Sequence, residues 1–557
     1  MTDRRQADKL LVILLTALFI INLLNGVFTE ILSDEAYYKL YAEHLDWGYF
    51  DHPPLTGFLV FISGLLFKGE LGVRFMTILL QPFTIWFIWL SVRKLNTTKK
   101  DAALFFILCC SFIMLSAYGF ITTPDAPLLF FTALFLLFYK KYITEGSFQD
   151  ALIMGVSMAG MAYSKYHAFI IIGLVILSNI KLLKQGKFWT GAVIAIILYT
   201  PHILWQASMN FPTLQFHMVS RTAQFKIAYL LEYWPNQLAV FNPFTLFALF
   251  YAIFKYPIKD QFEKTLVTIV AGMLLFFWAM GFKQHVEPHW TVAASLPALI
   301  LLFEKTKQSN FLKRYTRKFI LPSLVLILLA RIVLVTNLLP ERFGFNGKEA
   351  GYIAAGKIAG DLPVVYSGSF QGASLYHFFT GKPSFVLSSV TRRKTQFDFW
   401  QLECEYQNKP VVILNGNMPG HQEITIDGYS LTAYRTNNFQ SVSRMSIDFS
   451  LPGQNLMKND SITVSFTIHN PYTVDIDFNH EEFPVSVSAV YNRFKKTYLQ
   501  ACHLIYPVGI IKAGDSVSGI LTTVVPELDD VEYKFALSLT IPFNTGFNSD
   551  FVPVEIK

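Results

Sequence analysis

The sequence is short of charge and of cysteine. Charged residues make up 15% of the 557 residues, whereas soluble domains carry about 25%. Between residues 10 and 339, charges are confined to short loops between long apolar runs, which excludes an ordinary soluble domain there. Four cysteines are too few for a disulfide framework: Cys109 and Cys110 lie in an apolar run, and Cys404 and Cys502 could pair only if the tail is exported.

The chain has instead an apolar part followed by a tail of soluble composition. We expect a polytopic α-helical membrane domain over residues 1–339, an α/β subdomain over 340–416 and a β-sandwich-like domain over 417–557. Helical patterns at 348–358 and 371–379 and apolar strands at 364–366 and 411–414 indicate the α/β subdomain. Period-two alternation at 462–468 and 533–541 is typical of a β-sandwich.

The apolar runs predict about eleven membrane spans, because a helix needs about 20 apolar residues to cross the hydrocarbon core. The stretch Thr56–Phe67 is too short and is read as an interfacial or re-entrant helix. The first run lacks a signal-peptide cleavage site and is read as an uncleaved span. The predicted spans lie near residues 10–28, 71–92, 102–120, 126–140, 150–163, 167–181, 189–206, 237–254, 264–281, 290–303 and 319–339.

The positive charges predict which loops face the cytoplasm. With the N-terminus inside, the inside loops hold about 21 Lys and Arg residues and the outside segments about seven, which is the bias expected of cytoplasmic loops. The net charge of +7 is thus a property of loops and does not indicate nucleic-acid binding. We expect a multi-pass protein of the inner (cytoplasmic) membrane with its C-terminal tail outside. The inside loops are 1–9, 93–100, 140–149, 181–187, 255–264 and 304–318.

The first outer loop, residues 29–55, is acidic and rich in aromatic rings. Ser33 is a plausible helix N-cap, which would place Asp34 and Glu35 in the first turn, where the helix dipole favours negative charge. A solvated acidic loop is the simpler interpretation of most of its carboxylates. For Asp34, neighbouring rings would exclude water and raise the pKa, which suits a general base.

Three further polar positions fall on the predicted outer side. Asp51 and His52 precede two prolines, which would hold them on a fixed turn; the alternative is simply a turn before a helix. Asp125, between two prolines, could cap the next helix. Lys165 stands alone at the mouth of a helical hairpin, where either a lipid phosphate would pair with it or its amine would extend to the interface.

The segment His285-x-Glu287-x-His289 offers three side chains that would point to one side of an extended strand. Imidazole and carboxylate groups suit a divalent metal such as Zn, Mg or Mn. The spacing is not a strong zinc signature, and Pro288 is also an ordinary start for the tenth span. Both interpretations stay open.

Taken together, these segments resemble a known family. The Asp34-Glu35 pair, the run Gly-Tyr-Phe-Asp-His-Pro-Pro-Leu (48–55), Thr-Pro-Asp-Ala-Pro-Leu (123–128) and Ser-Lys-Tyr-His (164–167) are similar to the bacterial branch of the dolichyl-phosphate-mannose protein mannosyltransferase superfamily. This group has the C-type membrane glycosyltransferase (GT-C) fold and includes the lipid A aminoarabinose transferase. The resemblance covers roughly residues 10–340.

The resemblance implies a chemistry and a set of roles. Asp34, with Glu35, is the expected catalytic base or substrate anchor, and Asp51 is expected to bind a metal together with His285, Glu287 or His289. Lys165, His52, Tyr38 and Asp125 are assigned to the donor and its phosphate. His52 stands where the aminoarabinose branch has Lys, so its contact with phosphate would be weaker.

The sequence therefore predicts an inverting glycosyltransferase. It would transfer a sugar from a polyprenyl-phosphate donor to lipid A, a glycan or a protein at the outer membrane face, with no cofactor other than that metal. A transporter or flippase of lipid-linked glycans is the alternative, disfavoured because no internal repeat of the spans is visible. A non-enzymatic scaffold would leave the acidic loop and Lys165 unexplained.

Overall fold

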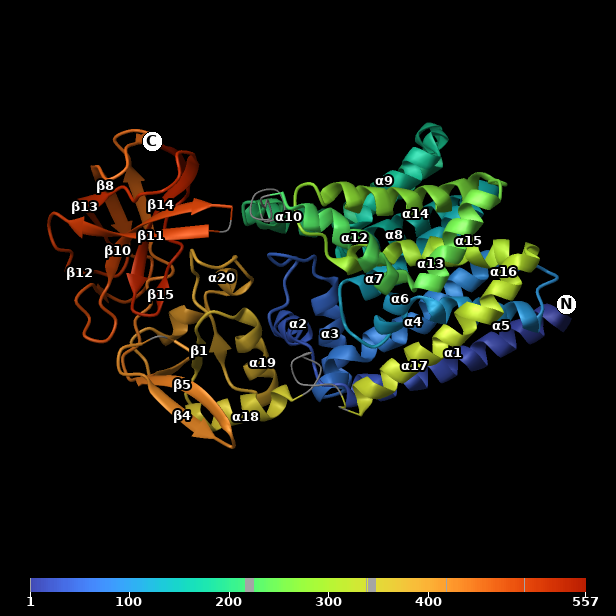
Figure 1. The fold of residues 1–557 in the computed structure, drawn as a ribbon, viewed down its shortest axis with the longest axis horizontal. Helices are drawn as coiled ribbons and strands as arrows, with labels where there is room; N and C mark the ends of the chain where they lie inside the picture. Colours follow the sequence, from blue (N-terminus) through green and yellow to red (C-terminus); the bar gives the residue numbers. More distant parts are fainter. Residues whose placement is uncertain (1, 216–224, 337, 339–346, 417, 495) are drawn as a thin grey trace. The chain divides into compact units, whose positions relative to one another are not determined.

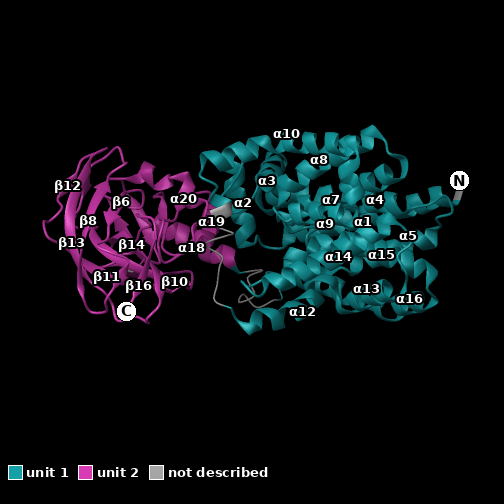
Figure 2. Ribbon diagram, turned by 90° about the horizontal axis from the view of Figure 1, so that it is seen from above, with its two compact units in different colours: residues 1–347 teal, residues 348–557 magenta. Residues whose placement is uncertain are grey.

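The computed structural model describes the chain except residues 1, 216–224, 337, 339–346, 417 and 495. The chain divides into two compact units, Met1–Gly347 and Lys348–Lys557 (Figure 2). The first unit is helical and the second contains the β-strands. The predicted combination of a helical membrane part and a C-terminal sheet region is thus confirmed.

The first unit is a bundle of helices of very different lengths (Figure 1). Rings from three segments meet in its core, where Trp89 contacts Phe105 at 5.2 Å between centroids and Phe105 contacts Phe303 at 5.4 Å. The helices are α1 (Thr2–Phe28), α2 (Ser33–Glu43), α3 (Leu55–Leu66), α4 (Gly69–Val92), α5 (Lys99–Ser111), α6 (Ile113–Ala117), α7 (Asp125–Glu145), α8 (Phe148–Ser164), α9 (Ala168–Ser178), η1 (Ile180–Lys184), α10 (Gly186–Ser208), α11 (Pro212–Gln215), α12 (Ile227–Phe241), α13 (Pro243–Lys255), α14 (Gln261–Met280), η3 (Pro288–Ala294), α15 (Ser295–Gln308), α16 (Asn310–Tyr315), the π-helical turn η4 (Thr316–Ile320) and α17 (Leu321–Val335).

Each predicted span contains helical residues. Among the described residues, six helices are long and apolar enough to cross a membrane by length and composition, and a bent pair would make a seventh. The six are α1, α4, α7, α10, α14 and the continuous helix Asn310–Val335. The count of about eleven spans therefore stays a prediction. Helix α3 has 12 residues, or about 18 Å at 1.5 Å per residue, which is too short to cross a core of about 30 Å.

The predicted span at 237–254 is wrong in shape. It is broken at Asn242, and α12 and α13 meet there at 99°. Pro243 disfavours helical backbone at the residue before it, and Asn242 has a φ of 70°, a conformation that asparagine tolerates better than most residues. The Asn242 side chain accepts a hydrogen bond from the Phe244 amide at 3.1 Å and so caps α13.

Polar contacts join the predicted inside loops to one another. Ion pairs connect loop 1–9 to 93–100, loop 304–318 to both 93–100 and 255–264, and Lys187 donates to the Gly146 carbonyl at 2.6 Å. Loops that meet in this way lie at one end of the bundle, as the charge bias requires of loops on the same side of a membrane. The ion pairs are Arg93–Asp8, Lys94–Glu304, Lys305–Glu263 and, with Asp101 just inside α5, Lys307–Asp101.

The second unit begins with a mixed sheet. Its strand order is β2-β1-β3-β5-β4, with β1 parallel to β2 and β3 and with β5 antiparallel to β3 and β4. This sheet continues past residue 416, the predicted end of the α/β subdomain, because a turn at Asp427-Gly428, both with positive φ, brings β5 back to pair with β3. Its elements are α18 (Lys348–Ala359), β1 (Val364–Tyr366), α19 (Phe370–Thr380), β2 (Ser384–Phe385), α20 (Phe397–Trp400), η6 (Leu402–Tyr406), β3 (Val411–Leu414), β4 (Gln422–Ile426) and β5 (Tyr429–Thr436).

The remaining strands form a strongly curved sheet of order β6-β8-β13-β11-β10-β14-β16-β7. Strand β11 pairs with β10 through its first half and with β13 through its second. Phe449 of β6 contacts Phe535 of β14 at 5.5 Å, so strands far apart in the sheet order face each other across a shared apolar core. The strands are β6 (Ser446–Ser450), β7 (Asn455–Leu456), β8 (Ser461–His469), β9 (Ile476–Asp477), β10 (Ser486–Arg493), β11 (Lys496–Leu504), β12 (Ile510–Ile511), β13 (Ser516–Val524), β14 (Glu532–Ile541), β15 (Asn544–Thr545) and β16 (Val552–Ile556).

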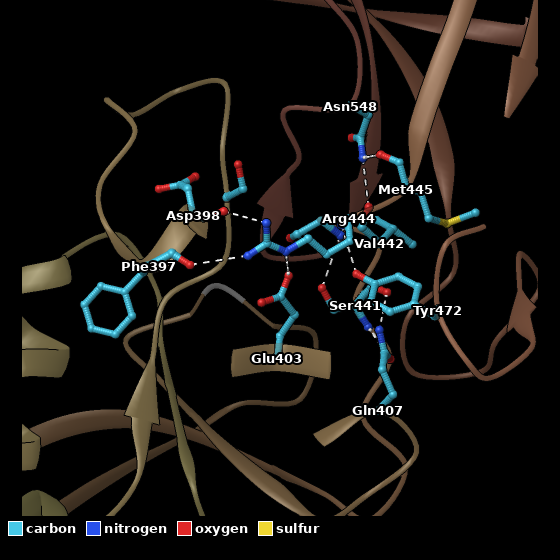
Figure 3. Close-up of polar contacts among 12 residues, drawn as sticks. Phe397, Asp398, Glu403, Gln407, Ser441, Val442, Arg444, Met445, Tyr472 and Asn548 are labelled. Carbon is cyan, nitrogen blue, oxygen red and sulfur yellow. Dashed lines mark hydrogen bonds and ion pairs between the residues drawn. The ribbon is translucent and has the colours of Figure 1, made fainter. Parts of the chain in front are cut away.

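Arg444 fastens the two sheets of the second unit together (Figure 3). Its guanidinium donates to Glu403 Oε1 at 2.9 Å and to the carbonyls of Phe397 and Asp398. Its own amide donates to the Tyr472 hydroxyl at 2.9 Å. Burial raises the pKa of the Glu403 carboxyl, and the Arg444 charge opposes that shift. The ion pair thus offsets the cost of burying Glu403 at the junction.

We expect Arg444→Met to destabilise the second unit by roughly 3 kcal/mol, because it leaves the Glu403 carboxylate buried without its partner. The apparent Tm of that unit in the intact protein should fall by about 10 °C, measured by differential scanning fluorimetry. Lys512→Met, which removes an exposed ion pair with Asp475, is the control and should leave Tm nearly unchanged. An equal fall in Tm in both variants would show that the contacts of Arg444 do not stabilise the junction of the two sheets.

Candidate functional site

Helix α2 is held in place by Glu35. Both carboxylate oxygens are occupied: Arg74 donates to Glu35 Oε1 at 2.8 Å and also to Oε2, the Thr122 amide donates to Oε1 at 2.8 Å, and the Leu32 amide donates to Oε2 at 3.0 Å. The N-cap is Leu32, and the prediction of Ser33 is wrong by one residue. Glu35, at the third helical position, reaches back to the amide of the cap residue, as the acidic residue of a capping box does.

The position of Glu35 does not suit a catalytic base. It is 1% exposed and it is paired with Arg74, whose side chain is also buried. Both of its carboxylate oxygens are already taken up by hydrogen bonds from Arg74 and from the backbone amides of Leu32 and Thr122. The predicted catalytic role is thus at odds with the position of Glu35, whose contacts instead fix the backbone beside Asp34.

Asp34 is exposed, in contrast to its neighbour. It interacts electrostatically with Tyr38 one turn further along α2, and so do Asp51 and Asp125. Burial and these three carboxylates raise the pKa of the Tyr38 phenol well above its ordinary value. Tyr38 is therefore a neutral hydrogen-bond donor at physiological pH, and predicted site residues from three separate segments interact with it electrostatically.

The turn that carries Asp51 and His52 is stiffened by aromatic stacking. Tyr41 and Tyr49 stack at 3.7 Å between centroids with 16° between planes, and the Tyr49 hydroxyl donates to the Tyr41 carbonyl at 2.8 Å. The Tyr41 hydroxyl donates to Asp51, which is 7% exposed. The His52 ring lies edge-on to Tyr38 at 5.9 Å. This turn is ordered through its rings as well as through the prolines.

The C-terminal end of α10 contacts the same loop, which the sequence did not predict. Trp205 donates to Asp46 at 2.7 Å, and His202 Nδ1 lies 2.7 Å from the Trp47 carbonyl. Gly48 packs directly beneath Trp205, where a Cβ would lie 2.3 Å from the ring, so only glycine fits. The available signal was a polar and aromatic last turn in a predicted span.

Lys165 and Asp125 form a buried ion pair. Lys165 Nζ lies 2.8 Å from both oxygens of Asp125, and the side chains are 8% and 2% exposed. Asp125 is the first residue of α7, as the helix-start interpretation expects. The amine therefore does not extend to the interface, and a lipid phosphate approaching it would compete with the Asp125 carboxylate.

The segment 285–289 does not present three side chains on one face. His285 Nε2 lies 3.9 Å from Glu287 Oε2, while Pro288 starts the 3-10 helix η3 and ends the extended alternation. The His289 ring instead lies 6.5 Å from that of Tyr118. Within the part of the chain that the structure describes, no three His, Cys, Asp or Glu side chains lie close enough to bind one metal ion.

The positions of Asp51, His285, Glu287 and His289 do not fit the predicted metal site. We expect transfer activity to stay within about twofold after dialysis against EDTA, because no three-ligand set is assembled. A tenfold loss that Zn, Mg or Mn restores would instead support the predicted site at Asp51, His285, Glu287 and His289. The His285→Ala variant would then have to lower metal affinity.

Comparisons with known proteins point to one group of enzymes. Residues 51–205 match the family model described as dolichyl-phosphate-mannose-protein mannosyltransferase. This segment contains Asp51, His52, Asp125 and Lys165 but not Asp34, Glu35 or Tyr38.

Two curated relatives match part of their length. Lipid A galacturonosyltransferase RgtD of Rhizobium johnstonii is 24% identical over 311 residues, which is 52% of this chain and 64% of the relative. An uncharacterized protein of Aquifex aeolicus is 31% identical over 154 residues, which is 26% of this chain and 31% of the relative. The matches therefore span less than two thirds of either relative.

Solved structures show the fold. ArnT from Cupriavidus metallidurans bound to undecaprenyl phosphate superposes with a TM-score of 0.58 at 14% identity, covering 76% of this chain and 97% of that one. The apo state of the same protein gives a TM-score of 0.56. About three quarters of this chain therefore shares its fold with a protein that was crystallised bound to undecaprenyl phosphate.

Proposed function

We propose that this chain is a membrane glycosyltransferase of the GT-C superfamily, as its family match and its fold support, and that it transfers a sugar from a polyprenyl-phosphate donor to a lipid, glycan or protein acceptor. The observation that carries the proposal is the buried ion pair of Lys165 with Asp125, together with Tyr38, whose ring lies 5.9 Å from that of His52 and which interacts electrostatically with Asp34, Asp51 and Asp125. An exposed carboxylate beside a neutral phenol and a buried cation supplies the groups that such a transfer needs.

Asp34 acts as the general base. Its carboxylate takes the proton of the acceptor hydroxyl as that oxygen attacks the anomeric carbon of the donor. The bond from this carbon to the phosphate oxygen breaks in the same step, and the polyprenyl phosphate leaves with the electron pair. A single displacement inverts the anomeric centre and needs no covalent enzyme intermediate.

Lys165 and Tyr38 receive the charge that develops on the leaving phosphate. A buried ammonium and a neutral phenol are donors held in place before reaction, and such groups stabilise a developing anion far better than mobile water. Asp125 keeps the ammonium in position until the anionic donor arrives. Asp51, held by Tyr41, orients the turn that brings His52 to the same place.

Glu35 is a positioning residue in this proposal. Its bonds to Arg74 and to the amides of Leu32 and Thr122 set the direction in which Asp34 leaves the helix. Precise placement of the reacting groups lowers the activation barrier by several kcal/mol. Glu35 would therefore affect the rate of transfer although it does not touch the substrate.

The reaction is assigned to the outer membrane face. The segments that carry the site contact one another, as in the pairing of Glu35 with Thr122 and of Lys165 with Asp125, and the lysine- and arginine-rich loops gather elsewhere. Because loops rich in Lys and Arg stay in the cytoplasm, the acidic site would face out. A reporter fused to the C-terminus that is active only in the cytoplasm would contradict this assignment.

The direct test is a transfer assay. Purified protein is incubated with radiolabelled polyprenyl-phosphate sugars, among them galacturonic acid and aminoarabinose donors, and with lipid A, glycan or peptide acceptors. Labelled acceptor and released polyprenyl phosphate should appear in equal amounts. Absence of transfer with every donor, together with movement of donor across vesicle membranes, would favour a flippase instead.

A further inference from the structure

A recess of about 540 Å³ lies far from the acidic site, beside α16 and the π-helical turn η4. Three cationic side chains and three rings line it, namely Arg314, Arg317, Lys318, Phe311, Tyr315 and Phe319. Both figures place α16 and the N-terminus at the end of the first unit that lies opposite α2 (Figures 1 and 2). The recess is thus separate from the proposed active site.

No carboxylate among the described residues pairs with the cations of this recess. The segment Asn310–Ile320 contains Lys313, Arg314, Arg317 and Lys318 and no acidic residue. Among the ion pairs of the described residues, none involves these four side chains, although Lys94, Lys305 and Lys307 at the same end are all paired. The recess therefore attracts an anion from outside the chain.

The aromatic rings of the recess pack against α13 and are also partly exposed. Phe311 packs against Tyr251 at 4.5 Å and Tyr315 against Phe247 at 5.2 Å, which ties the segment to α13. Phe311 and Phe319 nevertheless remain 46% and 37% exposed. Aromatic side chains of this kind favour the boundary between water and the acyl region of a bilayer.

The recess continues into an apolar surface on the adjoining helix. Helix α17 begins directly after the π-helical turn, and Leu321, Val325 and Leu326 are 41%, 57% and 66% exposed. A free phosphate would use only the cations, whereas a ligand with a charged head and acyl chains would use the cations and this surface together. The continuity points to a lipid.

We propose that this recess binds the headgroup of an anionic phospholipid, with the acyl chains along the exposed face of α17. The charge bias assigns this end of the bundle to the cytoplasmic leaflet, where anionic lipids attract basic residues by about 1 kcal/mol each near the surface. The π-helical turn supports a binding role, since such turns are rare and frequent at functional sites. The site is independent of the sugar transfer proposed above.

The proposal is tested by native mass spectrometry of the intact, detergent-purified protein titrated with phosphatidylglycerol. Arg314→Gln/Arg317→Gln/Lys318→Gln should weaken binding of the first lipid at least tenfold. Lys313→Gln lies on the same segment but does not line the recess, and with Lys99→Gln/Lys100→Gln it is the matched control. Both controls should bind within twofold of the unaltered protein, and Tm should be the same in all variants.

Two results would overturn the proposal. Undiminished phosphatidylglycerol binding by the triple variant would place the lipid elsewhere. Equal binding of phosphatidylcholine would show that the charge of the headgroup does not define the ligand. Displacement of phosphatidylglycerol by inorganic phosphate at millimolar concentration would show that the acyl chains do not define it. Because the assay measures lipid and not sugar, it stands whether or not the transferase proposal does.

Discussion

Asp34→Asn is expected to lower the rate of sugar transfer by about a thousandfold, within the range that a general base contributes. The amide keeps the size of the side chain but cannot take the acceptor proton. Asp34 is exposed, so the change should leave Tm and donor binding unaltered. The rate is followed by transfer of labelled sugar under single-turnover conditions, and Tm by differential scanning fluorimetry.

Glu35→Gln is the matched neighbour. It removes the charge that the buried Arg74 faces, and breaking a buried pair in this way costs about 3–5 kcal/mol. We therefore expect a large fall in Tm for Glu35→Gln and a fall in rate without a fall in Tm for Asp34→Asn. An Asp34→Asn protein that retains more than a tenth of the rate would remove Asp34 from the role of base.

Lys165→Met is expected to destabilise the first unit by about 3–5 kcal/mol and to abolish transfer. The change leaves Asp125, 2% exposed, as a buried charge without its partner. The double variant Lys165→Met/Asp125→Leu removes both charges, and replacement of a buried pair by apolar side chains is often neutral or stabilising. Its Tm should therefore return close to that of the unaltered protein.

Transfer by the double variant separates structure from function. Lys165 is proposed to meet the donor phosphate, so the double variant should stay at least a hundredfold less active although it is stable. Lys165→Arg should keep part of the activity, because it preserves the charge. A stable double variant with normal transfer would show that the ion pair only holds α7 to the hairpin.

The sequence was informative wherever structure follows from near neighbours. The helix expected at 348–358 is α18, and the strands expected at 364–366 and 411–414 are β1 and β3 with the same bounds. Periodicity and apolar runs are set by residues that are close along the chain, so these elements can be located without a fold. The break at Asn242-Pro243 carried the same kind of local signal, which the continuous apolar run concealed.

Partners across the chain could not be predicted in the same way. Nothing in the sequence near Glu35 indicates that Arg74, 39 residues further on, would form an ion pair with it. A position in the first turn of a helix explained the carboxylates of Asp34 and Glu35 equally well. Lys165 and Asp125, 40 residues apart, were each assigned to the donor, but their pairing with each other was not foreseen. In the sequence, His202 and Trp205 form the end of an ordinary predicted span. Their contacts with the loop at Asp46 and Trp47 exist only in the folded chain.

The Arg74 side chain holds several backbone segments together through hydrogen bonds. Besides Glu35, it donates to the carbonyls of Gly26, Thr29 and Glu30, and through Glu35 it reaches the amides of Leu32 and Thr122. The end of α1, the start of α2 and the loop before α7 are therefore held by one connected set of hydrogen bonds. Loss of the Arg74 side chain would remove support from all three at once.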